Sequence, residues 1–188
     1  TVGPLVFERS ARRERPPQEI IGFETNGRVI GRYEKFEATF ELSRWYANPF
    51  DPSQINVEGR FIGPSGETTT VPGFFYQDFR RTLVMGRERL IPVGAPKWKV
   101  RFAPTTIGAY RFKLVIDDGE RLVAEPARFT CVPADNPGFV RVSAIDDRCF
   151  EFDDGGFFYP VGHNIPATYN LKAAKHLDLT LKPRGGTY

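Results

Sequence analysis

Lys97-Trp-Lys-Val-Arg-Phe-Ala103 and Ala109-Tyr-Arg-Phe-Lys-Leu-Val-Ile116 are the two stretches of sequence that decide the fold. In the first, Trp98, Val100 and Phe102 alternate with basic residues, and in the second an apolar residue again occupies every second position. A period of two turns one apolar face toward a core and one polar face toward water, which is the pattern of a half-buried β-strand. The sequence therefore predicts two strands and makes Trp98 a core residue.

Further strands are expected on both sides of this pair. The alternation is clearest in residues 34–42 and 54–62, and shorter strands are predicted at 5–8, 19–24, 67–71, 121–124 and 127–132. Asp117-Asp-Gly119 has the chemistry of a hairpin turn. Seven or so strands at short spacing, without a helical pattern between them, predict an all-β fold, an immunoglobulin-like antiparallel β-sandwich.

One stretch inside this region shows no regular pattern. Residues 77–96 are basic and follow neither the strand nor the helix period. The sequence therefore predicts a long connection here, with at most a short strand.

The chain divides into three parts by composition. We expect the sandwich within residues 1–133, with its core in about 33–133, a linker at 134–138, and a hairpin followed by a further strand within 139–188. Residues 157–161 form a continuous apolar run, as expected for a strand that is buried on both faces and opens another domain. Without that domain, this strand is expected to pack on the sandwich, to mediate self-association or to be poorly ordered.

Composition narrows the possible partners. Among 188 residues, 26 basic and 23 acidic side chains give a net charge of +3, which offers little support for nucleic-acid binding. An arginine cluster at 9–15 is interpreted as a solvated segment, because acidic residues and prolines interrupt it. No apolar run approaches the roughly 20 residues that cross a bilayer, so we expect no membrane partner. The sequence does not indicate the cellular compartment. It also does not decide whether Cys131 and Cys149 form a disulfide.

No catalytic constellation is expected in this chain. The sequence has no GxSxG motif and no glycine-rich phosphate loop. Adjacent carboxylates occur only in turn-like contexts, at 117–118, 146–147 and 153–154, where Asp caps the local backbone. Neither cysteine lies in a metal-ligand pattern, so we predict no metal site and no cofactor.

Two pairs of residues are candidates for binding a substrate. Trp45 and Tyr46 lie just before an Asn-Pro-Phe-Asp-Pro turn and outside the clean alternation, where they could stack on a sugar or simply cover the edge of the sandwich. His163 and Asn164 follow the apolar strand at 157–161. Polar residues at the exit of such a strand line the active site of a barrel, or merely satisfy a turn.

An ordered set of motifs resembles a known family. The motifs run through residues 34–37, 48–51, 71–76, 98–104, 107–110 and 129–133, and continue into Phe150-Glu-Phe-Asp-Asp-Gly155 and Phe158-Tyr-Pro-Val-Gly-His-Asn164. Together they resemble the N-terminal β-sandwich (DUF5060-like) domain of bacterial glycoside hydrolases, followed by the first strand of a (β/α)8 barrel. The chain departs from the family at Tyr110, where the family usually has Trp, and in the basic stretch after Gln77-Asp78.

The resemblance implies a parent enzyme that cleaves glycosidic bonds with two carboxylates on later barrel strands. It implies an accessory role for this chain: packing on its own catalytic barrel, shaping the cleft or contacting carbohydrate, with no catalytic residue of its own. The alternative is a free-standing carbohydrate-binding or adhesion-type sandwich.

Overall fold

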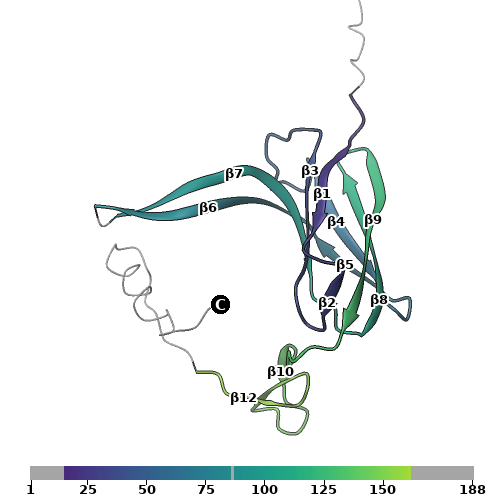
Figure 1. The fold of residues 1–188 in the computed structure, drawn as a ribbon, viewed down its shortest axis with the longest axis vertical. Helices are drawn as coiled ribbons and strands as arrows, with labels where there is room; N and C mark the ends of the chain where they lie inside the picture. Colours follow the sequence, from purple (N-terminus) through teal and green to yellow (C-terminus); the bar gives the residue numbers. More distant parts are fainter. Residues whose placement is uncertain (1–14, 86, 162–188) are drawn as a thin grey trace, which may run out of the picture.

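A computed structural model describes residues 15–85 and 87–161 (Figure 1). The expected strand at 5–8, most of the arginine cluster, and the candidate residues His163 and Asn164 lie outside these ranges. The described part of the chain is all-β. Its strands are β1 (Ile20–Thr25), β2 (Val29–Gly31), β3 (Phe36–Leu42), β4 (Asn56–Ile62), β5 (Thr68–Pro72), β6 (Phe74–Val84), β7 (Arg87–Phe102), β8 (Gly108–Asp117), β9 (Arg121–Val132), β10 (Val140–Val142), β11 (Phe150–Phe152) and β12 (Phe157–Phe158).

Two sheets form the predicted sandwich. One sheet has the order β1-β3-β7-β6 and the other β2-β9-β8-β4-β5, and all neighbours are antiparallel except the parallel pair β2 and β9. The alternation in the sequence is confirmed, because the apolar positions of β3, β7 and β8 face a common core. Trp98 is buried there as predicted.

The core consists largely of aromatic rings. Phe36 from β3 stacks on Phe129 from β9 with 4.5 Å between ring centroids, and it contacts Phe61 and Phe112 at 5.5 and 5.6 Å. The sheets approach one another closely at Gly59, where a Cβ atom would lie 2.4 Å from a methyl carbon of Val100. That position in β4 therefore requires glycine for lack of space.

The prediction for residues 77–96 is wrong. Instead of an irregular connection, the structure has one long hairpin, in which Asp78 pairs with Val93 and the ladder continues to Val84 opposite Arg87. We call residues 78–93 the arm, and it projects away from the sandwich (Figure 1). The sequence lacks the two-residue alternation of apolar and polar residues because both faces of the arm are exposed. Neither face needs to be apolar throughout.

The base of the arm is bent by an irregularity between Tyr76 and Asp78. Gly94 has a positive φ of 69° at this point, and the side chain of Gln77 donates to the carbonyl oxygens of Val93 and Gly94 at 3.1 and 3.2 Å. A bulge of this kind re-aims a strand and increases its twist. It therefore separates the part of β7 that packs in the sandwich from the part that leaves it.

The third sheet, which we call the small sheet, has the order β10-β11-β12. It is attached to the end of the sandwich, because the ring of Phe139 packs edge-on against Tyr33 at 5.6 Å and the side chain of Asn136 donates to the Tyr33 carbonyl oxygen. The expected burial of residues 157–161 is not seen: Phe157, Tyr159 and Val161 are 67%, 72% and 82% exposed. The strand there covers only two residues and has a neighbour on one side only.

Both cysteines are free thiols, Cys131 buried in the core and Cys149 partly exposed. No helix among the described residues is long and apolar enough to cross a membrane.

Candidate functional site: an aromatic groove above a buried ion-pair network

An aromatic groove lies beside the segment that follows β3. It has a volume of about 430 Å³, and its lining includes Leu42, Trp45, Pro49, Phe75, Pro96 and Trp98. Trp45 is 84% exposed, so most of its indole surface is free to contact a ligand. A concave, mostly apolar surface with exposed aromatic side chains has the general character of a small-molecule site.

A row of rings continues from the floor of the groove to the neighbouring turn. Phe75 packs edge-on against Trp98 at 5.4 Å, and Phe50 packs edge-on against Phe75 at 5.9 Å. Phe50 is 73% exposed and sits in the predicted turn, where the amide N–H of Phe50 donates to the Asn48 side-chain oxygen. The sequence indicated Trp45 but not Phe50 or Phe75, since aromatic residues in a turn or a short run have no period that reveals their exposure.

The structure separates the two neighbouring candidates, Trp45 and Tyr46. Tyr46 is only 8% exposed, and its hydroxyl lies 2.7 Å from an oxygen of Asp118 and 2.8 Å from the side-chain oxygen of Gln18. Burial raises the pKa of the Tyr46 phenol, and the hydrogen bond to the Asp118 carboxylate raises it further. Tyr46 is therefore a buried, neutral hydrogen-bond donor in the lining of the groove, and Trp45 alone of the pair offers an exposed ring.

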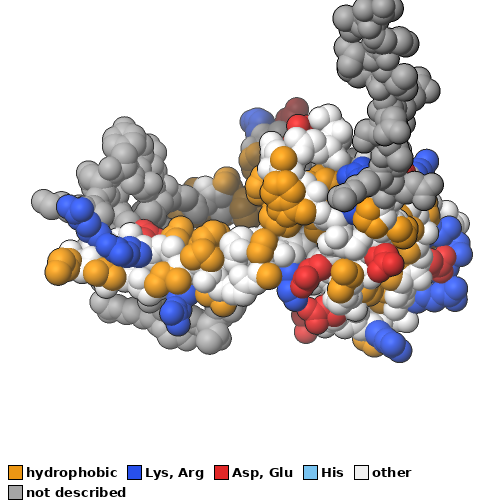
Figure 2. Space-filling model, turned by 90° about the horizontal axis from the view of Figure 1, so that it is seen from above, with side chains coloured by type: hydrophobic (Ala, Val, Ile, Leu, Met, Phe, Trp, Pro, Cys, Tyr) orange, Lys and Arg blue, Asp and Glu red, His pale blue; other side chains and the backbone are white. Residues whose placement is uncertain are grey.

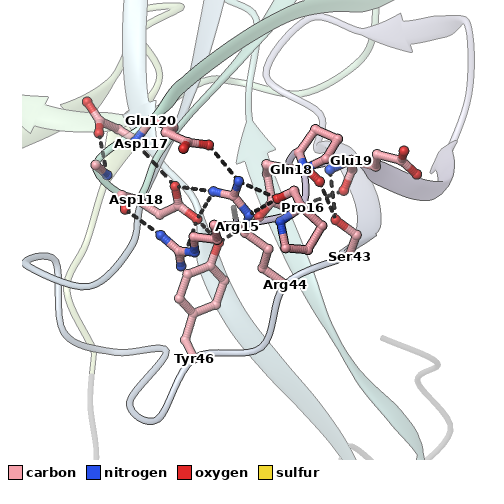
Figure 3. A network of polar contacts seen from close by, with 12 residues as sticks. Arg15, Pro16, Gln18, Glu19, Ser43, Arg44, Tyr46, Asp117, Asp118 and Glu120 are labelled. Atoms are coloured by element: carbon pink, nitrogen blue, oxygen red, sulfur yellow. Dashed lines mark hydrogen bonds and ion pairs between the residues drawn. The ribbon is translucent and has the colours of Figure 1, made fainter. Parts of the chain in front are cut away.

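Arg44 holds the same segment in place from inside. Its guanidinium donates to both oxygens of Asp118, at 2.9 and 3.0 Å, to Glu120 and to the carbonyl oxygen of Pro16 (Figure 3). The side chain of Arg44 is 4% exposed and that of Asp118 is fully buried, so this is an ion pair removed from water.

Asp118, in the β8–β9 turn, is contacted by side chains from two other parts of the chain. Arg15 adds a second cation at 3.3 Å, beside Arg44 and the Tyr46 hydroxyl. Burial alone would raise the pKa of Asp118, but the hydrogen bonds from Tyr46 and Arg44 outweigh burial and lower it. The network thus ties the N-terminal segment and the β8–β9 turn to the segment that carries Trp45.

One member of each adjacent carboxylate pair caps a turn, as the sequence indicated. The side chains of Asp117, Asp146 and Asp154 each accept a hydrogen bond from a backbone N–H two residues further on. Among residues 15–85 and 87–161, no group of three or more His, Cys, Asp or Glu side chains could hold a metal ion.

A second groove, of about 440 Å³, lies on the outer face of the four-stranded sheet at the base of the arm. Its polar groups already satisfy one another: Glu37 binds Lys99 at 2.9 Å and Arg101 at 2.6 Å, and Lys99 lies over the Tyr76 ring at 4.6 Å. A ligand would have to displace these contacts. We therefore take the aromatic groove as the candidate site.

Glu37 provides a test of this polar surface. Burial raises its pKa, but hydrogen bonds from Lys99, Arg101 and Lys35 outweigh burial and lower it from 4.5 to about 2. A carboxyl with a lowered pKa stabilises the fold above its unfolded-state pKa and loses that contribution as the pH falls toward the folded-state value. Glu37→Gln is expected to cost about 1 to 2 kcal/mol at pH 7, because solvent screens part of the interaction.

Urea unfolding of the wild type and Glu37→Gln at several pH values measures this effect. The difference in unfolding free energy should stay constant above about pH 4.5 and shrink as the pH falls toward 2. A difference that does not change over this interval contradicts the ion-pair assignment.

Comparison with known proteins finds one matching family profile. A family profile described as a domain of unknown function (DUF5060) matches residues 29–117, a little under half of the chain. This range covers β2 to β8 and includes both the aromatic groove and the arm. No curated protein matches the chain.

Two solved structures have similar parts. One is described as a "putative glycoside hydrolase" from Bacteroides vulgatus, with 24% identity over 71% of this chain and 22% of that chain and a TM-score of 0.49. The other is an alkylpurine DNA glycosylase from Pseudomonas fluorescens, with 15% identity over 62% of this chain and 30% of that chain and a TM-score of 0.37. The chain spans less than a third of the length of either protein.

Proposed function

We propose that this chain is a non-catalytic accessory module of a glycoside hydrolase, which packs on a (β/α)8 catalytic barrel beginning near Phe157 and shapes its cleft. The observation that carries the proposal is the agreement between the family profile and the sequence motifs. All the sandwich motifs except the one at 129–133 fall within the matched residues 29–117. The motif series then continues into β11 and β12, in the small sheet attached to the sandwich.

The test begins with the polypeptide that the reading frame encodes beyond Tyr188. We expect it to continue into a (β/α)8 domain and to hydrolyse a polysaccharide, while the 188-residue chain shows no turnover on the same substrates. A stop codon directly after Tyr188, or robust hydrolysis by the chain alone, contradicts the proposal. The carboxylates that perform the chemistry would lie on later strands of the barrel.

Carbohydrate binding by the sandwich itself is the second candidate function, and the exposed indole of Trp45 beside the groove favours it. If the groove binds sugar, Trp45→Ala should weaken binding on the order of tenfold, because an aromatic contact contributes about 1 to 1.5 kcal/mol. The melting temperature should stay unchanged, since the side chain is exposed. Titration against a panel of soluble polysaccharides measures the affinity.

Ile145→Ala is the matched control, because Ile145 is also a highly exposed hydrophobic residue but lies in the loop between β10 and β11, outside the lining of the groove. Equal affinities of the Trp45→Ala variant, the control and the wild type would exclude the groove as the site. Absence of binding to every polysaccharide would remove this function from the isolated chain.

A further inference from the structure

The arm is a two-stranded ribbon with apolar side chains on its surface and no core of its own. Paired residues project to the same face, so the register places Phe79, Leu83, Leu90 and Pro92 on one face together with Arg81 and Glu88. Arg81 and Glu88 form an ion pair at 2.8 Å, so this face, which we call the neutral face, carries no net charge. An isolated two-stranded hairpin is only marginally stable in water, and exposed apolar surface of this kind marks an interaction site.

The opposite face of the arm is basic. It carries Arg80, Arg87 and Arg89 with Asp78 as its acidic residue, and Val84, Ile91 and Val93 lie among them. In Figure 2 hydrophobic side chains are visible along the arm, with Lys or Arg side chains among them toward its tip. Burying three guanidinium groups without partners is costly, whereas the neutral face loses little on leaving water. The neutral face is therefore the better docking surface.

A second copy of the chain is a poor occupant of this face. Phe79, Leu83 and Leu90 are 50%, 62% and 58% exposed, which offers on the order of 300 Å² of apolar area if a large side chain can bury about 150 to 250 Å². Two arms stacked on each other would bury about 600 Å², less than the apolar share of about 900 Å² in a standard interface of about 1,600 Å².

A second set of exposed apolar side chains lies at the end of the small sheet: Phe157 in β12, and Tyr159 and Val161 in the segment that follows it. In Figure 1 the arm and the end of β12 lie on the same side of the sandwich, and the chain runs onward from β12. Stacked arms would leave this second set uncovered. One domain that follows β12 in the same polypeptide could cover both sets of apolar side chains. Because it would be tethered, its effective concentration would be about millimolar, and a small contact area would be enough for binding.

We propose that the neutral face of the arm docks on the domain that follows β12 in the same polypeptide, so that the arm and the small sheet hold this domain from two sides. The inference rests on the proposed function, which provides the following domain. It adds the surface of this chain that contacts that domain, the neutral face of the arm. The surface that receives the arm should be apolar where it meets Phe79, Leu83 and Leu90. It should be free of unpaired charge there, because the face that it covers is neutral.

Hydrogen exchange read by mass spectrometry tests the docking. Amides of residues 79–92 should exchange at least tenfold more slowly in the polypeptide extended through the following domain than in the 188-residue chain. The double variant Leu83→Asp/Leu90→Asp should restore fast exchange in the extended protein. Ile91→Asp, on the basic face, is the control and should leave the protection in place.

Each outcome separates the two proposals. If no domain follows in the reading frame, the proposed function fails and the docking fails with it. If the domain is present but the arm exchanges as fast as in the 188-residue chain, only the docking is overturned. Protection that rises with protein concentration, together with a dimer mass, would assign the face to a second copy and also overturn it. Unchanged melting of the double variant in the 188-residue chain verifies that the sandwich still folds.

Discussion

Arg44→Ala is expected to lower the free energy of unfolding by about 3 kcal/mol at pH 7. The substitution removes a cation that is 4% exposed and leaves the fully buried carboxylate of Asp118 without its main partner. Truncating one partner of a buried ion pair typically costs about 3 to 5 kcal/mol, because the remaining charge is uncompensated. The loss should fall at the lower end of this range, since Arg15 still lies 3.3 Å from Asp118.

The effect should weaken in acid. Burial raises the pKa of Asp118, but the hydrogen bonds from Tyr46 and Arg44 outweigh burial and keep it below the ordinary value. Stability from such a carboxylate is present above its unfolded-state pKa and is lost as the pH falls through the folded-state pKa. The difference between the wild type and Arg44→Ala should therefore shrink as the pH falls through the folded-state pKa of Asp118.

Chemical denaturation at several pH values measures both effects, and Arg28→Ala is the control. Arg28 is exposed, and its removal should change the unfolding free energy by no more than about 0.5 kcal/mol. A loss below 1 kcal/mol for Arg44→Ala would show that the network does not hold this segment. If Arg44→Ala also weakens sugar binding when the protein is fully folded, the network positions Trp45 as well as stabilising the fold.

The sandwich was predictable from the sequence because its strands each have one buried face. Phe36, Ala38 and Phe40 alternate with polar residues, and all three are fully buried. The arm was missed for the opposite reason, since its residues face water on both sides and its hairpin tip contains Met85 at a positive φ of 50° instead of a typical Asn-Gly turn. A strand that is exposed on both faces does not show the alternation of apolar and polar residues by which strands are predicted.

The candidate site was predictable only in part. Trp45 is a candidate from the sequence because it falls outside the strand pattern, but nothing local distinguishes it from Tyr46, its neighbour. Tyr46 is buried, unlike Trp45, and its hydroxyl donates a hydrogen bond to Asp118. Asp118 lies 72 residues away from Tyr46 in the sequence. Arg44 likewise has partners 28, 74 and 76 residues away, and such contacts depend on how the sheets assemble.

Phe36→Ala is expected to cost about 4 kcal/mol of unfolding free energy and on the order of 10 to 15 °C in melting temperature. The ring of Phe36 is fully buried and comes from β3 in the four-stranded sheet, whereas Phe61, Phe112 and Phe129 come from the other sheet. Removing it opens a cavity between the two sheets, where close packing such as that at Gly59 limits how far they can collapse.

Differential scanning calorimetry of Phe36→Ala, Phe36→Leu and Phe157→Ala tests this account. Phe36→Leu retains most of the volume and should cost about 1 to 2 kcal/mol, because it loses the stacking on Phe129 but leaves a smaller void. Phe157 is 67% exposed in the small sheet, so Phe157→Ala should leave the melting temperature of the 188-residue chain unchanged. If Phe36→Ala melted within about 2 °C of the wild type, the aromatic cluster between the sheets would not be what holds the sandwich together.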